Sequence, residues 1–245
     1  MKSAYLCIDQ GNTSTKIGIF VNNNLVETKK FEKFGRNEII LIFTNYNIIA
    51  TILSSVTINN DNIVSILKEH SARIVILSHE TDIPIKNLYK NPETLGKDRL
   101  AAVIGATYLK PNTDLLVIDA GTAITYDFIN KKSEYIGGNI APGVDLRLRA
   151  LHEFTAKLPL VEADVKSPFL GFDTRTAISS GVLQGIYFEI NGYIDNLKFK
   201  YPELSVFLTG GSTFYFDRTL KNTIFAEKNL VLIGLNRILQ FNVKK

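Results

Sequence analysis

YLCIDQGNTSTKIGIF (residues 5–20) and LLVIDAGTAITYDFI (residues 115–129) are two versions of one pattern, about 110 residues apart. Each is an apolar run that ends in Asp-x-Gly and a nearby Thr, followed by a second apolar run. With Asp9 set against Asp119 and one residue gapped, the threonines also align. We expect each version to form a β-hairpin that turns around a phosphate. Glycine lets the backbone approach closely, Thr hydroxyls and turn N–H groups donate hydrogen bonds, and the carboxylate handles a cation.

The duplication sets the expected domain organisation. A chain of 245 residues can bury one large core or two cores of about 120 residues, and a repeated hairpin favours two. Pro, Asn and Asp gather at residues 109–114 (LKPNTD), directly before the second hairpin, which is typical of a linker. We therefore predict two α/β domains, residues 1–112 and 113–245.

Composition excludes several classes of protein. The net charge of +4 comes from 28 basic and 24 acidic residues spread along the chain. This spread is typical of a solvated surface and does not indicate a basic patch that binds nucleic acid. One cysteine, Cys7, excludes an internal disulfide framework and gives no support to a Cys-based metal site. The first apolar run meets Asp9 too early for a secretory signal, and no apolar stretch is long enough to span a bilayer. We expect a cytoplasmic protein that binds neither membrane nor nucleic acid.

Apolar periodicity predicts alternating elements. In the first half, strands are expected at residues 4–8, 17–20, 49–56 and 73–77 and helices at 37–45 and 60–69. In the second half a Gly/Pro loop, GGNIAPG at 137–143, leads into a long helix. Its apolar positions recur at spacings of three and four, at Ile178, Val182, Ile186, Ile190, Ile194 and Leu197, and that face could serve the core or a subunit contact. A strand ending in LTGG (208–211) and a helix at 230–241 close the chain.

The two commonest nucleotide-binding motifs, the Walker A loop and a strand-linked G-x-G-x-x-G, are absent. The double hairpin with its late Gly-Gly turn instead resembles the phosphate-1, phosphate-2 and adenosine motifs of the actin, hexokinase and heat-shock ATPase superfamily. Within it, the chain closely resembles the type III pantothenate kinases. The similarity follows family order over nearly the whole chain, through DQGNTSTK (9–16), YKNPETLGKDR (89–99), DAGTAIT (119–125), GGNIAPG (137–143), LHEFTAKLP (151–159) and TGG (209–211).

The resemblance implies a fold and an activity. The fold is two ribonuclease-H-like domains with a nucleotide cleft between them. The activity is ATP-dependent phosphorylation of pantothenate to 4′-phosphopantothenate, the first step of coenzyme A biosynthesis, by a homodimer.

It also implies roles for individual residues. Asp98 resembles the base that takes the proton of the pantothenate hydroxyl, a step that requires orientation more than early deprotonation. Arg99 suits the pantothenate carboxylate or the migrating phosphoryl group. On sequence alone, a structural role is the competing interpretation for three of these residues: Asp98 as a helix N-terminal acid, Tyr89 as a packed aromatic and Thr174 as a helix N-cap. The residues expected to contact pantothenate are Tyr89, Gly96, Lys97, Asp98, Arg99 and Thr174. Lys97 departs from the family, which usually has a small residue there.

ATP, Mg²⁺ and a monovalent cation, K⁺ or NH₄⁺, are the implied ligands of the hairpins. Asp119 resembles the family's monovalent-cation ligand, and Asp9 is expected to hold magnesium. The implied ATP contacts are Asp9, Gln10, Gly11, Asn12, Thr13, Ser14, Thr15, Lys16 and Thr122.

Two alternatives to this hypothesis are open, one with a different substrate and one in a different class of protein. A kinase or phosphatase of the same superfamily could act on another small hydroxyl compound, because fold similarity does not fix the substrate. A non-catalytic homologue could regulate transcription. The intact aspartates and glycine turns argue against the second alternative, as does the lack of a basic cluster.

Overall fold

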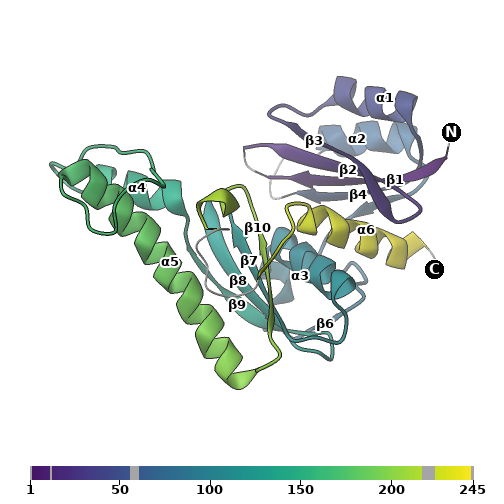
Figure 1. Cartoon of the computed structure of the whole chain (residues 1–245). Coiled ribbons are helices and arrows are strands. Elements are labelled where there is room, and N and C mark those ends of the chain that lie inside the picture. Colours follow the sequence, from purple (N-terminus) through teal and green to yellow (C-terminus); the bar gives the residue numbers. More distant parts are fainter. Residues whose placement is uncertain (1, 12, 56–60, 217–223, 244–245) are drawn as a thin grey trace. The chain divides into compact units, whose positions relative to one another are not determined.

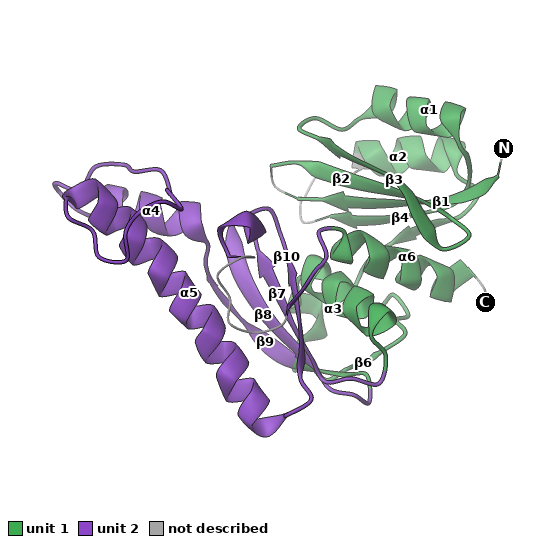
Figure 2. Cartoon of the chain, viewed as in Figure 1, with its two compact units in different colours: residues 1–111, 133–136, 229–245 green, residues 112–132, 137–228 purple. Residues whose placement is uncertain are grey.

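The computed structural model describes residues 2–11, 13–55, 61–216 and 224–243. By its internal contacts the chain forms two compact units (Figure 2): unit 1 is residues 1–111, 133–136 and 229–245, and unit 2 is residues 112–132 and 137–228. The first exchange between units falls inside the expected linker. Residues 229–245 group with unit 1, whereas the sequence-based division placed them in the second domain. The division into functional domains at residue 112 stays a prediction.

Unit 1 contains a five-stranded sheet in the order β3-β2-β1-β4-β5, drawn in Figure 1. β2 is antiparallel to both β1 and β3, whereas β4 is parallel to β1 and to β5. The expected first hairpin is therefore confirmed as β1–β2. The half-exposed strand β3 was missed, because its charged outer residues hide the apolar alternation. The strands are β1 Ser3–Gln10, β2 Thr15–Val21, β3 Asn24–Phe31, β4 Asn47–Ser55 and β5 Ile74–Ile76.

Helices cover both faces of this sheet (Figure 1). The apolar sides of α1 Arg36–Asn45 and α2 Asp61–His70 pack on one face, where they share a core with alternate residues of β1 and β2. α6 Leu230–Val243 packs against the strands from the other side together with α3 Lys97–Leu109. A two-residue strand, β6 Lys86–Asn87, and a 3₁₀ turn, η1 Pro92–Thr94, precede α3. The expected helices are confirmed; Val56 and Asn60 of the expected segments lie outside the described residues.

Two glycines let α3 and α6 pack closely. A Cβ on Gly105 would lie 2.3 Å from the carbonyl oxygen of Leu230, and one on Gly234 would lie 1.8 Å from that of Ala101. The backbones therefore meet directly at this crossing. These contacts hold α3 against α6 in unit 1. The first turn of α3 carries Lys97, Asp98 and Arg99.

Unit 2 repeats the strand pattern of unit 1. Its sheet runs β11-β10-β7-β8-β9, with β7–β8 antiparallel and β10 parallel to both β7 and β11. β9 begins in unit 1, where it pairs with β6, and continues in unit 2. The strands are β7 Leu115–Ala120, β8 Ala123–Ile129, β9 Glu134–Pro142, β10 Ser205–Thr209 and β11 Ile224–Ala226. The expected Gly/Pro loop at 137–143 was wrong: all but its last residue continue strand β9, because strand pairing outweighs the weak propensity of Gly and Pro.

The helices of unit 2 are α4 Val144–Glu153 and the long α5 Thr174–Lys200, with a 3₁₀ turn, η2 Thr213–Tyr215. The isoleucine face of α5 is confirmed as helical and is buried in the unit 2 core beside residues of β7, β8 and β10. That face is therefore used within the chain. Our expectation that it could form a two-fold subunit contact is wrong.

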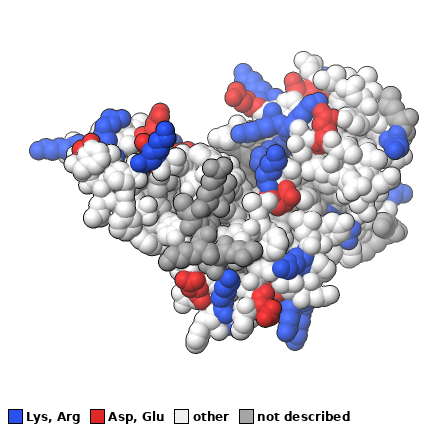
Figure 3. Space-filling model, in the orientation of Figure 1, with Lys and Arg blue, Asp and Glu red and all other residues white. Residues whose placement is uncertain are grey.

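In the part of the chain that the structure describes, no helix combines the length and apolar character needed to cross a membrane. Basic and acidic side chains lie interspersed on the face drawn in Figure 3. This distribution agrees with the even spread of charge along the sequence.

Candidate active site

The first hairpin turn holds the expected phosphate-binding residues of unit 1. Asp9 and Gln10 end β1, and Thr15 and Lys16 begin β2, with Asp9 opposite Lys16 in the ladder. The backbone N–H of Gly11 donates to the carbonyl of Ser14 across 3.0 Å and closes the turn. Thr13 is exposed at its tip, and Asn12 lies outside the described residues. The turn thus presents short polar residues beside a half-buried carboxylate.

β4 places two hydroxyl residues next to this turn. Ser54 lies opposite Asp9 in the parallel ladder, and Ser55 lies opposite Gln10. The hydroxyl of Ser54 and the side-chain oxygen of Gln10 are buried, and neither has a hydrogen-bond partner in the described structure. An orphaned buried polar atom costs about 1–3 kcal/mol, and the great majority of such atoms in native proteins are paired. This feature fits a polar ligand at the end of β1 and β4.

Lys97 connects this strand end to α3. Its ammonium donates to the carbonyl oxygen of Ser55 across 3.1 Å. The carbonyl belongs to the last residue of β4, directly beside Gln10. Lys97 therefore has a structural use, because it ties the start of α3 to the end of β4, the strand that pairs with β1 of the first hairpin.

Asp98 occupies the first turn of α3, as its helix-acid interpretation predicts. One carboxylate oxygen accepts from the backbone N–H of Arg99 at 2.9 Å, and the side chain is half-buried. Gly96, the residue before the helix, leaves room for it, because a Cβ there would lie 2.6 Å from the same oxygen. The geometry holds Asp98 in place while leaving part of it accessible to a substrate.

Arg99 lies deeper than the sequence suggested. It is only 6% exposed, and one guanidinium nitrogen donates to the hydroxyl of Tyr135 at 3.1 Å. The guanidinium carbon also lies 5.8 Å from the ring centroid of Tyr89, within cation–π distance. Sequence reasoning missed Tyr135, since a lone aromatic before a glycine pair carries no functional signal. Whether Arg99 contacts a substrate stays a prediction.

The second hairpin has the same construction in unit 2. Asp119 lies opposite Thr125 in the β7–β8 ladder, as Asp9 lies opposite Lys16 in β1–β2. The N–H of Gly121 donates to the carbonyl of Ala123 at 3.0 Å, one residue shorter than the equivalent bond of the first turn. The one-residue gap in the aligned sequences is therefore confirmed.

Two glycines from other segments pack onto this second turn. A Cβ on Gly210 would lie 2.4 Å from a carboxylate oxygen of Asp119, and Gly210 has a positive φ of 102°. A Cβ on Gly143 would lie 2.3 Å from the carbonyl oxygen of Gly121, and its N–H donates to that of Thr122 at 2.9 Å. The Asp-x-Gly-Thr turn, the end of GGNIAPG and the TGG turn are thus brought together, and Thr122 remains exposed.

Thr174 is the first residue of α5 and is exposed. Its expected alternative role as the N-cap is wrong. The cap is Asp173, whose carboxylate accepts from the N–H of Thr176 at 2.8 Å. The preceding carboxylate is a stronger acceptor for the free N–H groups of the first turn, so the hydroxyl of Thr174 is not needed there.

Asp9 and Asp119 are the expected metal ligands of the two hairpins. Among the described residues, no three His, Cys, Asp or Glu side chains gather into a group that could hold an ion. Asp9 and Asp119 each end a strand beside a glycine turn. One carboxylate together with phosphate and water oxygens is a donor set that suits Mg²⁺, which is commonly bound through nucleotide phosphates.

Two solved structures share the fold of this chain. A provisionally assigned Baf family transcriptional activator from Campylobacter jejuni has a TM-score of 0.65 and 22% identity, covering 98% of this chain and all of that one. A provisionally assigned N-acetylmannosamine kinase from Listeria monocytogenes has a TM-score of 0.58 and 16% identity, covering 98% and 99%. At these identities they establish the fold alone, which is that of the actin-like ATPases and sugar kinases, as expected.

Sequence comparison then identifies the family. The type III pantothenate kinase model matches residues 5–196. The type III pantothenate kinase of Phocaeicola vulgatus is 48% identical over 239 residues, covering 98% of this chain and 99% of that protein. The chain belongs to the type III pantothenate kinase family, and the resemblance seen in its motifs is confirmed.

Proposed function

We infer that this chain is an ATP-dependent kinase that phosphorylates pantothenate to 4′-phosphopantothenate, which commits pantothenate to coenzyme A. Family membership over nearly the full length carries the inference. The intact site supports it, because the turns built from Asp9-x-Gly and Asp119-x-Gly have the same ladder geometry and the half-buried Asp98 is held at the start of α3.

We propose that ATP phosphates contact the two hairpin turns and that Mg²⁺ lies at Asp9. ATP supplies the γ-phosphoryl group, and the metal offsets the charge of its phosphates. The buried unpaired oxygens of Gln10 and Ser54 and the glycines packed on the second turn are what a preformed polar site requires.

Asp98 is the proposed general base. It orients the pantothenate hydroxyl and accepts its proton as the oxygen attacks the γ-phosphorus. Phosphoryl transfer passes through a loose transition state in most analyses, so orientation is the larger part of this role. Gly96 and Arg99 lie beside Asp98, and the ring of Tyr89 lies near the guanidinium of Arg99. These three residues and Thr174 of α5 are the proposed contacts for the rest of pantothenate.

The direct test is an initial-rate assay with ATP, Mg²⁺ and a panel of small alcohols and sugars that includes pantothenate. Phosphorylation of pantothenate at a kcat/KM at least about a hundredfold above every other acceptor is expected. A sugar or another alcohol as the best acceptor would transfer the protein to a different kinase of the same fold.

We also propose a monovalent-cation site at Asp119. The carboxylate of Asp119 carries the same sign of charge as the phosphates, and a cation between them would offset the repulsion. The rate should rise with KCl when sodium or tetramethylammonium chloride holds ionic strength constant. Asp119→Asn should blunt this response and raise the KM for ATP more than that for pantothenate. Equal rates in all three salts would assign Asp119 a different role.

A homodimer and a cytoplasmic location remain predictions. Support for a dimer comes from large exposed apolar side chains of unit 2, which are Phe154, Phe169, Leu170, Phe172 and Phe188. If each site borrows a residue from the neighbouring subunit, mixing Asp98→Asn and Thr174→Ala protomers should restore activity. A monomer by light scattering at the assay concentration would refute both the homodimer and the shared site.

A further inference from the structure

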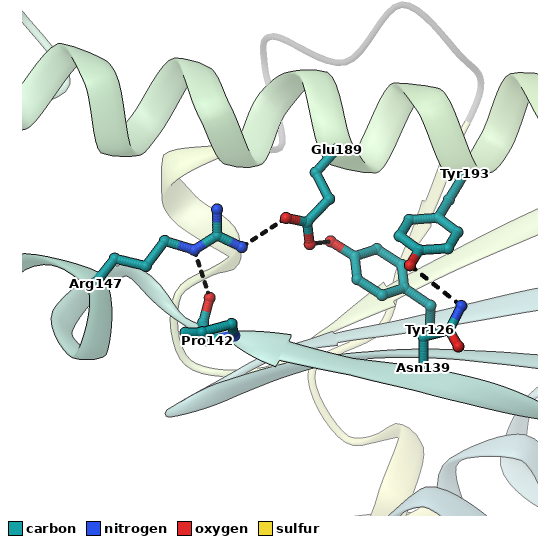
Figure 4. Close-up of polar contacts among 6 residues, drawn as sticks. All are labelled: Tyr126, Asn139, Pro142, Arg147, Glu189 and Tyr193. Atoms are coloured by element: carbon teal, nitrogen blue, oxygen red, sulfur yellow. Dashed lines mark hydrogen bonds and ion pairs between the residues drawn. The ribbon is translucent and has the colours of Figure 1, made fainter. Parts of the chain in front are cut away.

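A chain of polar contacts in unit 2 connects α5 to the end of β9 (Figure 4). Glu189 of α5 is its centre. One carboxylate oxygen accepts from the hydroxyl of Tyr126 at 2.7 Å, and the other lies 2.6 Å from a guanidinium nitrogen of Arg147. The Nε–H of Arg147 in turn donates to the carbonyl of Pro142 at 2.7 Å. The guanidinium of Arg147 therefore binds Glu189 of α5 and Pro142 of β9 at the same time.

An aromatic pair holds the same strand at a second point. The rings of Tyr126 and Tyr193 are stacked, with centroids 4.0 Å apart. The side-chain amide of Asn139 donates to the hydroxyl of Tyr193 at 3.1 Å. Burial and the Glu189 carboxylate raise the pKa of Tyr126, so its phenol remains a proton donor to that carboxylate. Residues on α4 and α5 thus hold β9 at two points, Asn139 and Pro142, and Tyr126 of β8 joins them.

The strand held in this way leads directly onto the second hairpin turn. Pro142 precedes Gly143, whose N–H donates to the carbonyl of Thr122, and a Cβ added to Gly143 would lie 2.3 Å from the carbonyl oxygen of Gly121. A shift of Pro142 would move Gly143, and Gly143 has no room to move without displacing the turn. The network therefore sets the position of Thr122, although none of its members belongs to the turn.

The fold of unit 2 does not require these charges. The isoleucine face of α5 already packs in an apolar core. The side chains of Arg147 and Glu189 are 22% and 26% exposed, so water can solvate either one if its partner is removed. A partly buried ion pair of this kind contributes little net stability, because desolvation offsets the attraction. Precise placement of the strand end is the better explanation for it.

We propose that Arg147 and Glu189 are positioning residues for nucleotide binding, acting through Pro142 and Gly143 on the turn that carries Thr122. This rests on the proposed function in one respect, the contact of that turn with ATP. Pantothenate affinity is not expected to depend on the network, since most of its proposed contacts lie at the start of α3.

The test measures binding of Mg²⁺ with adenylyl imidodiphosphate, a non-hydrolysable ATP analogue, by calorimetry. Arg147→Met removes both bonds and should raise Kd by about tenfold, the effect of losing one charge-assisted hydrogen bond of ordinary strength. Arg147→Lys keeps the charge for Glu189 but cannot also reach Pro142 with a second N–H, so it should weaken binding to a smaller extent. The KM for pantothenate at saturating ATP should stay within about twofold of the wild-type value in both variants.

Arg149→Met is the matched control. Arg149 lies on the same helix as Arg147, but it pairs with Glu153 of that helix, and the two side chains are 60% and 52% exposed. Its Kd should equal that of the wild type. A wild-type Kd for Arg147→Met, or equal losses for nucleotide and pantothenate, would overturn the proposal. Wild-type protein that binds the analogue but does not phosphorylate pantothenate would refute the proposed function alone.

Discussion

Gly210 is the residue at which a small change should have the largest predictable effect. Its φ of 102° is one that residues with a side chain rarely adopt, and a methyl group there would lie 2.4 Å from the Asp119 carboxylate and 2.5 Å from the carbonyl oxygen of Ala120. Backbone strain of this kind costs about 1–3 kcal/mol. Overpacking costs typically about 1–3 kcal/mol more.

Gly210→Ala should therefore lose about 3 kcal/mol of stability, which lowers the Tm of a protein of this size by roughly 6–12 °C. The added methyl group also pushes on Asp119, so the KM for ATP should rise by about tenfold or more, equivalent to a loss of about 1.4 kcal/mol. Calorimetric melting and initial rates against ATP concentration measure the two effects.

Gly211→Ala is the neighbouring control, because a Cβ on Gly211 would meet nothing within 4 Å. Its Tm should match that of the wild type. If Gly211→Ala lowers the Tm as much as Gly210→Ala does, or if Gly210→Ala retains the wild-type KM for ATP, then Asp119 is not held by this glycine contact.

Two further predictions concern stability, and differential scanning calorimetry of the ligand-free protein checks both. Ser54→Ala should leave Tm unchanged or raise it, since it removes an orphaned hydroxyl. Ser71→Ala should instead cost about 1 kcal/mol of stability, because the Ser71 hydroxyl bonds that of Thr51 at 3.2 Å. Equal losses of stability in the two variants would show that Ser54 has a structural partner. Gly234→Ala should destabilise by about 1–3 kcal/mol at the α3–α6 crossing, whereas Gly192→Ala, with open space around it, should stabilise by up to about 1 kcal/mol. Stabilisation by both would contradict the close approach of these two helices.

The sequence predicted the hairpins well because their signals are local. Apolar strands that end in Asp-x-Gly-Thr specify a strand and its turn without distant partners, and the repeat supplied a second, independent instance. The motifs also predicted the family. The long helix was equally clear, since the isoleucines that face the core recur with helical spacing.

Features that depend on distant segments could not be predicted. Nothing around Tyr135 indicates that it meets Arg99, and nothing around Glu189 indicates Arg147, 42 residues away. The alternative in which Thr174 caps α5 was wrong because Asp173 stands beside it and is the cap, a choice that only backbone geometry decides.

The most direct test of the account compares Asp98→Asn with the wild type in two measurements. The substitution keeps the size of the side chain but cannot accept a proton, so kcat for pantothenate should fall by roughly a hundredfold or more, the scale of a lost general base. The Kd for Mg²⁺ with the non-hydrolysable ATP analogue should remain unchanged. Near-wild-type turnover by a correctly folded Asp98→Asn protein would contradict the assignment of Asp98 as the base.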